Sequence, residues 1–125
     1  MKLDSLASQL RGFVGITRKR QIGDLMQFFP IESDRIIASF GEDAAVIDDG
    51  EEVMLFAADG IWSQLMEADP EWSGYCSVLV NVHDIAAMGG WPVAMVDVLS
   101  VADQDVAAKV LGGMKKAIEK FRVPI

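Results

Sequence analysis

Residues 71–92 read EWSGYCSVLVNVHDIAAMGGWP, and this stretch decides the fold. Its apolar side chains recur at i, i+3, i+4 and i+7, which predicts a long helix over residues 71–88. The stripe that should face the core consists of Tyr75, Val78, Leu79, Val82, Ile85 and Ala86. Gly89-Gly90 ends the helix, and Pro92 prevents it from resuming. A polar line runs beside the stripe at i, i+4 and i+7, and it consists of Ser77, Asn81 and Asp84.

Strand patterns occur on both sides of this helix. Residues 44–48 (AAVID) and 53–58 (VMLFAA) are short apolar runs with a turn signal at Asp49-Gly50 between them, so we predict a β-hairpin. Residues 93–101 (VAMVDVLSV) are rich in β-branched side chains and predict a further strand. The connection over 61–70 reads as irregular.

A second long helix follows the last of these strands. Asp103 is a suitable N-cap, and the pattern after it predicts a helix over residues 104–121. The pair Gly112-Gly113 lowers helix propensity, and we attribute it to close packing on the sheet. The chain ends in VPI (123–125), which reads as the beginning of another strand and indicates a fragment of a longer protein.

Composition and charge limit the classes of function. The 125 residues include 11 Lys and Arg against 19 Asp and Glu, and the net charge of −8 disfavours nucleic-acid binding. One cysteine and one histidine exclude a disulfide framework and multi-histidine zinc sites. The sequence shows no signal-peptide pattern and no apolar run long enough to span a membrane. We therefore expect a cytoplasmic protein with neither nucleic acid nor membrane as a partner.

Several acids occur where a solvated surface does not explain them. Glu42-Asp43 precedes an apolar run, Asp59 ends the strand predicted over 53–58, and Asp84 lies in a mostly apolar helix. Convergent carboxylates repel one another, and Mg²⁺ relieves this repulsion because it prefers oxygen ligands. The structural alternative is that Asp59 is a turn residue and Asp84 caps or pairs locally. The sequence has no Walker P-loop, so a nucleotide would be held through carboxylate–metal bridges and backbone groups.

Three other features have both a functional and a structural interpretation. His83 is either a phosphate donor or a partly buried helical histidine. Cys76 reads as a buried structural thiol. The basic run at 18–20 (RKR) either contacts nucleotide phosphates or is solvated, and the segments 3–12 and 24–29 around it read as short helices.

Three ordered motifs resemble those of the AIR synthase-related (PurM-like) superfamily. They are GEDAAVI at 41–47, ADG at 58–60 and VNVHDIAAMGGWP at 80–92. This superfamily includes aminoimidazole ribonucleotide (AIR) synthase, thiamine-monophosphate kinase, selenophosphate synthetase and the hydrogenase maturation protein HypE. The N-terminal part is most similar to the archaeal branch called methanogenesis marker protein 2.

The resemblance implies an α+β fold of the PurM-like N-terminal type. In that fold a mixed or antiparallel sheet carries helices on one face and joins a second subunit in a dimer barrel. The implied organisation is a helical arm over 1–39 and an ATP-binding domain over 40–125, cut from a longer two-domain protein. The implied partners are a second copy bound through the sheet, the C-terminal domain of the same protein, and a small-molecule acceptor.

The resemblance also implies a site for ATP and Mg²⁺. By position in the motifs, Asp43, Asp59 and Asp84 match the metal-binding acids, Glu42 replaces a second Asp, and Asn81 matches the helix Asn. We expect Glu42, Asn81 and His83 to hold the ATP phosphates, although His83 stands where several branches of the family carry Ser or another small residue. The implied chemistry is ATP-dependent phosphoryl transfer to, or activation of, a small acceptor. The family's GG(H/D)T segment is absent, so we expect this fragment alone to be inactive. The alternative hypothesis is a non-catalytic dimerisation or regulatory module that retains the fold.

Overall fold

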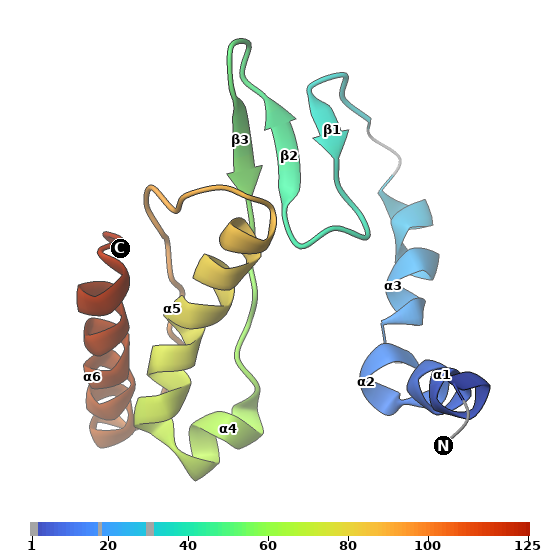
Figure 1. Cartoon of the computed structure of the whole chain (residues 1–125). Coiled ribbons are helices and arrows are strands. Elements are labelled where there is room, and N and C mark those ends of the chain that lie inside the picture. Colours follow the sequence, from blue (N-terminus) through green and yellow to red (C-terminus); the bar gives the residue numbers. More distant parts are fainter. Residues whose placement is uncertain (1–2, 18, 30–31) are drawn as a thin grey trace. The chain divides into compact units, whose positions relative to one another are not determined.

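A computed structural model describes residues 3–17, 19–29 and 32–125. The chain divides into two units, Met1–Asp34 and Arg35–Ile125, which are described separately. The first unit contains the helices α1 (Leu3–Gly12), α2 (Val14–Thr17) and α3 (Arg20–Leu25) and the 3₁₀ turn η1 (Met26–Phe28) (Figure 1). The helix predicted over 3–12 is confirmed. The one predicted over 24–29 instead begins at Arg20 and tightens into η1. The arm's basic run at 18–20 falls partly outside the described residues.

The second unit begins with a three-stranded antiparallel sheet. Its strands β1 (Ile36–Ala38), β2 (Ala45–Asp48) and β3 (Val53–Phe56) follow the order β1-β2-β3. The predicted hairpin is confirmed, with Val46 opposite Leu55. Gly50 makes its turn possible with a φ of +96°, and its N–H donates to Asp48 Oδ1 over 2.9 Å. The second strand stops at Phe56 rather than Ala58, and β1 was not predicted.

Three helices complete the second unit: α4 (Ser63–Ala68), α5 (Pro70–Ala87) and α6 (Gln104–Phe121). The two long helices match the prediction within one residue at each end, whereas α4 replaces the irregular connection expected at 61–70. The core lies between α5 and α6 and consists of Val78, Val82, Val110, Met114, Ala117 and Val123. The fold is therefore α+β, as predicted.

Glycines set how closely the two long helices approach. A Cβ at Gly74 would overlap the Val110 carbonyl, and a Cβ at Gly113 would overlap the Glu71 carbonyl. The prediction that Gly112-Gly113 packs on the sheet is wrong, because Gly113 contacts the backbone of α5 while Gly112 has no atom near its Cβ position. The glycine pair thus serves helix–helix packing at one of its two positions.

The strand predicted over 93–101 does not form. This segment has no regular secondary structure, and the 123–125 segment has none either. One backbone hydrogen bond joins them, from Met95 N–H to Pro124 O over 2.9 Å. A β-strand needs a neighbouring strand to receive its hydrogen bonds, and within the described residues this segment has no such ladder. Residues 93–101 therefore have the β-branched composition of a strand but lack a partner strand.

Candidate functional site

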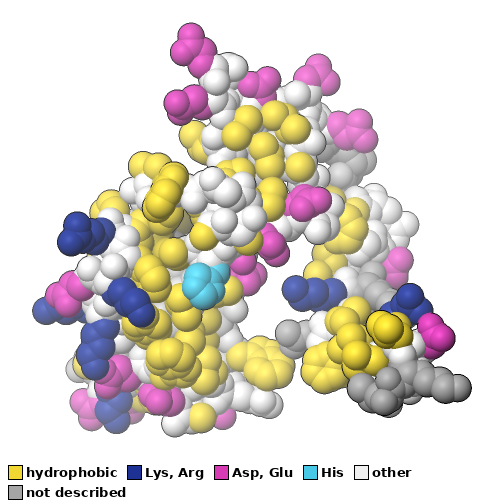
Figure 2. Space-filling model, in the orientation of Figure 1, with side chains coloured by type: hydrophobic (Ala, Val, Ile, Leu, Met, Phe, Trp, Pro, Cys, Tyr) yellow, Lys and Arg dark blue, Asp and Glu magenta, His cyan; other side chains and the backbone are white. Residues whose placement is uncertain are grey.

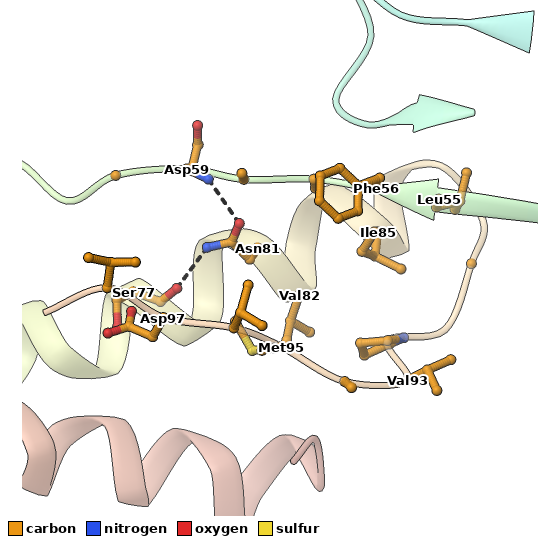
Figure 3. A pocket seen from close by; sticks show the side chains of 18 of the residues that line it. Leu55, Phe56, Asp59, Ser77, Asn81, Val82, Ile85, Val93, Met95 and Asp97 are labelled. Carbon is orange, nitrogen blue, oxygen red and sulfur yellow. Dashed lines mark hydrogen bonds between the residues drawn. The ribbon is translucent and has the colours of Figure 1, made fainter. Parts of the chain in front are cut away.

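A groove of about 1330 Å³ lies within the second unit. One wall is β3 and its extension through residue 61, the other wall is the segment 91–100, and α5 contributes the floor. Figure 3 shows Phe56, Ile85 and Val93 among its apolar lining side chains. Polar side chains of Asp59, Ser77, Asn81 and Asp97 also line it.

Asn81 ties the chain after β3 to helix α5. Its Oδ1 accepts a hydrogen bond from the backbone N–H of Asp59 over 2.9 Å, and its Nδ2 donates to Ser77 O over 2.9 Å. These two bonds fix the orientation of the Asn81 amide and the position of Asp59. Figure 3 shows the Asp59 carboxylate directed away from Asn81, and Asp59 is exposed. The Asp59 backbone is therefore held at a defined place, and its carboxylate is open to a ligand.

The other predicted site residues do not line this groove. Glu42 and Asp43 lie in the exposed loop between β1 and β2, where the Glu42 N–H donates to Ser39 O over 3.3 Å. His83 is exposed on α5, and the neighbouring Asp84 is half-buried. The structure thus brings together two of the six residues, Asp59 and Asn81.

The described part of the chain contains no group of three or more His, Cys, Asp or Glu side chains arranged to hold a metal ion. The metal role of Asp43, Asp59 and Asp84 stays a prediction. Any Mg²⁺ held at Asp59 would need further oxygen ligands from water, from nucleotide phosphates or from another chain, which is how proteins commonly bind this ion.

Two polar residues of the groove, Asp97 and Ser77, were not among the predicted site residues. The sequence placed Asp97 within the strand predicted over 93–101 and Ser77 in the polar line of the long helix. Figure 3 places Asp97 on the wall formed by 91–100. An acid in the middle of a β-branched run is the sequence signal that could have identified Asp97.

The Cys76 thiol on α5 is half-buried. Burial raises the pKa of Cys76, and the negative charge of Asp69 raises it further. The neutral thiol is therefore favoured, which suits a structural role on α5 and not a nucleophile.

In the described residues, we find no helix long and apolar enough to cross a membrane.

Comparison with known proteins identifies related sequences. Residues 41–125 match the family described as AIR synthase related protein, N-terminal domain. An uncharacterized protein of Methanocaldococcus jannaschii is 48% identical over 130 residues, covering 100% of this chain and 40% of that protein. An uncharacterized protein of Synechocystis is 38% identical over 125 residues, covering 98% of the chain and 39% of the relative.

A relative with a named activity is more distant. The phosphoribosylformylglycinamidine cyclo-ligase of Methanococcoides burtonii is 32% identical over 95 residues, covering 71% of this chain and 28% of the enzyme. No solved structure matches. The chain spans at most about 40% of the length of these relatives.

Proposed function

Because the chain belongs to the AIR synthase-related family, we propose that it is the ATP- and Mg²⁺-binding N-terminal domain of an enzyme that acts on a small molecule. The whole enzyme would transfer a phosphoryl group from ATP to this acceptor, or use ATP to activate it. The observation that carries the proposal is the family match over 41–125 together with the Asn81 amide, which accepts the backbone N–H of Asp59 just after β3.

The proposal assigns a role to each site residue. Asp43, Asp59 and Asp84 would contribute metal ligands, and the ion when bound would neutralise charge on the phosphates. Asn81 would offer its second Nδ2 hydrogen to a phosphate oxygen, because its first donates to Ser77 O. His83 would donate to phosphate from the exposed face of α5, and Glu42 would act through the metal.

Two macromolecular partners belong to the same proposal. A second copy would cover exposed side chains of the sheet, of which Ile37 is 60%, Met54 53% and Phe56 61% exposed. The rest of the longer polypeptide would complete the nucleotide site, since the relatives are more than twice the length of this chain. We expect light scattering to report a dimer, and a monomer at high concentration would contradict this partner.

Calorimetric titration of ATP tests the nucleotide site. We expect the chain to bind ATP and to require Mg²⁺ for this binding. The Methanocaldococcus jannaschii relative should behave in the same way, and the same substitutions can be made in it. Asp59→Asn and Asp84→Asn should each weaken binding by about tenfold or more, because a lost charged ligand costs at least about 1.4 kcal/mol.

Glu119→Gln is the matched control. It removes one negative charge from an exposed position on α6 whose side chain is 66% exposed. Equal effects of Glu119→Gln and Asp59→Asn would mean that net charge, not ligation, governs binding. ATP affinity unchanged by both Asp59→Asn and Asp84→Asn would remove the metal assignment.

A further inference from the structure

Positive charge is concentrated on helix α6, although the chain as a whole is acidic. Residues 109–122 contain five of the eleven Lys and Arg residues and one acid, so this stretch has a net charge of +4 in a chain of −8. All five cationic residues are exposed, and Figure 2 shows Lys and Arg side chains on the left of the view, where Figure 1 places α6. The helix dipole favours cations in the last turn, which accounts for Lys120. It gives no such advantage to Lys109 in the first half of α6.

Three of these cations lie on the side of α6 that meets α5. Lys109, Gly113, Lys116 and Lys120 recur at i, i+4, i+7 and i+11, which places them on one stripe of the helix. A Cβ at Gly113 would overlap the backbone of α5, so the stripe follows the boundary between the two helices. Lys116 forms an ion pair with Glu71. Within the described residues Lys109 and Lys120 form no ion pair, so both are available to a partner.

An aromatic pocket lies beside this stripe. It has a volume of about 360 Å³ and is lined by Asp69, Glu71, Trp72, Tyr75, Gly113 and Lys116. The rings of Trp72 and Tyr75 are stacked, with their centroids 5.1 Å apart and an angle of 8° between their planes. Lys120 Nζ lies 5.8 Å from the centroid of the Tyr75 ring, and Trp72 is 49% exposed. Partly exposed Trp and Tyr side chains around a pocket are typical of the residues that dominate protein–protein binding.

The polar groups of the pocket favour a protein over a nucleic acid. Asp69 is exposed, and its Oδ1 accepts the Trp72 N–H over 3.0 Å, which leaves its Oδ2 for a further donor. A peptide offers backbone N–H donors to such an oxygen, whereas the phosphates of a nucleic-acid backbone are acceptors. A long polyanion would also meet the acids that give the chain its charge of −8. A short acidic segment contacts the positive stripe alone.

We propose that the boundary between α5 and α6 is a docking surface for a short acidic segment of another protein. An aromatic side chain of the segment enters the pocket and packs on Trp72, and carboxylates on either side of it pair with Lys109 and Lys120. These two cations are 11 positions apart, or about 16 Å along the helix axis, a distance that about five extended residues span. Opposite charges on the two surfaces favour this kind of partner over others. The inference does not depend on the proposed ATP site.

Synthetic heptapeptides test the surface. The probe has tryptophan at its centre and glutamate at every other position, and two comparison peptides replace the tryptophan by alanine or the glutamates by lysine. Fluorescence anisotropy of labelled peptides, at low salt and without ATP or Mg²⁺, measures their affinity for the 125-residue chain. We expect the tryptophan–glutamate peptide to bind at least about fivefold more tightly than the alanine peptide, because its ring packs on Trp72. The lysine peptide should not bind at the same concentrations.

Two double variants test the positive stripe. Lys109→Gln with Lys120→Gln removes the two cations assigned to the partner and should weaken the tryptophan–glutamate peptide by about fivefold or more. Lys115→Gln with Arg122→Gln is the matched control, because it removes the same charge from the same stretch of chain. Lys115 lies on another face of α6, where it pairs with Glu119 over 3.8 Å. We expect the control to change the affinity by less than about twofold, with thermal unfolding as the check on folding.

Trp72→Ala tests the pocket independently of charge. This variant should reduce the affinity for the tryptophan–glutamate peptide to that for the alanine peptide, and it should leave the alanine peptide unaffected. The comparison of the two peptides on the unmodified chain stands even where Trp72→Ala unfolds.

Three results would overturn the proposal. Equal affinities of the unmodified chain for the tryptophan and alanine peptides would leave only unspecific charge attraction. Equal effects of the two double variants would mean that net charge, not the stripe, governs binding. Tighter binding of a seven-nucleotide thymidine strand than of the tryptophan–glutamate peptide would make a nucleic acid the partner. Because every measurement is made without ATP and Mg²⁺, the docking surface and the ATP site fail separately.

Discussion

Gly113 lies where α6 meets the backbone of α5, and Gly112 beside it faces open space. Gly113→Ala would force its Cβ into the Glu71 carbonyl, so we expect a loss of at least about 2 kcal/mol in the free energy of unfolding. Gly112→Ala gains helix propensity without a clash and should stabilise by about 0.5–1 kcal/mol. Urea unfolding followed by circular dichroism measures both, and equal effects of the two substitutions would disprove this packing.

The Cys76 thiol provides a pH-dependent prediction. Burial and then the charge of Asp69 raise its pKa above the ordinary value of 9.0. Alkylation by iodoacetamide requires the thiolate, so its rate should reach half-maximum at a higher pH in the folded chain than in urea. The thiol's contribution to stability is present below the unfolded pKa and is lost as pH rises through the folded one. Identical rate profiles in the folded and unfolded chain would contradict this shift.

At the site, the sequence identified residues but not their contacts. Asp59 and Asn81 were both predicted, yet they are 22 positions apart and meet through a backbone N–H and not through the carboxylate. The spacing along one helix correctly predicted that Asn81 lies beside Ser77, because helical spacing is a local feature of the sequence. The relationship of Asp59 to Asp43 depends on how the β1–β2 loop folds, which no local pattern specifies.

Among the elements, α6 has the best-defined beginning. Asp103 accepts hydrogen bonds from the N–H groups of Asp105 over 2.8 Å and Val106 over 3.0 Å. Asp103→Ala removes both bonds, so we expect a loss of about 1 kcal/mol in the free energy of unfolding. Asp103→Asn keeps an N-cap acceptor and should lose much less. Urea unfolding measures both, and equal losses would mean that charge, not the cap, is what matters.

The elements that were predicted correctly are those whose signals are local. The helix α6 follows from its N-cap and its 3.6-residue period, and the β2–β3 hairpin follows from the turn at Asp49-Gly50. The strand predicted over 93–101 is wrong for the opposite reason. Its β-branched composition indicates side chains that would suit a half-buried strand. A strand also requires a partner strand for its hydrogen bonds, and that partner lies far away in the sequence.

For the molecule as a whole, hydrophobic surface is distributed unevenly. Figure 2 shows hydrophobic side chains at the surface of the visible face, and Trp91, Val93 and Val98 are 85% or more exposed. Large apolar side chains this exposed mark an interaction site where they form one continuous patch. Buried apolar residues are concentrated instead between α5 and α6. Local stability should therefore be high between α5 and α6 and low in the segment that carries Trp91, Val93 and Val98.

Hydrogen exchange measures that difference residue by residue. Amides of the α5–α6 core, such as Val78 and Ala117, should exchange most slowly, because only global unfolding exposes them. Within 93–101, Met95 should exchange more slowly than Val96, since its N–H is bonded to Pro124 O. Exchange at Val96 as slow as at Met95 would contradict this difference between the two amides.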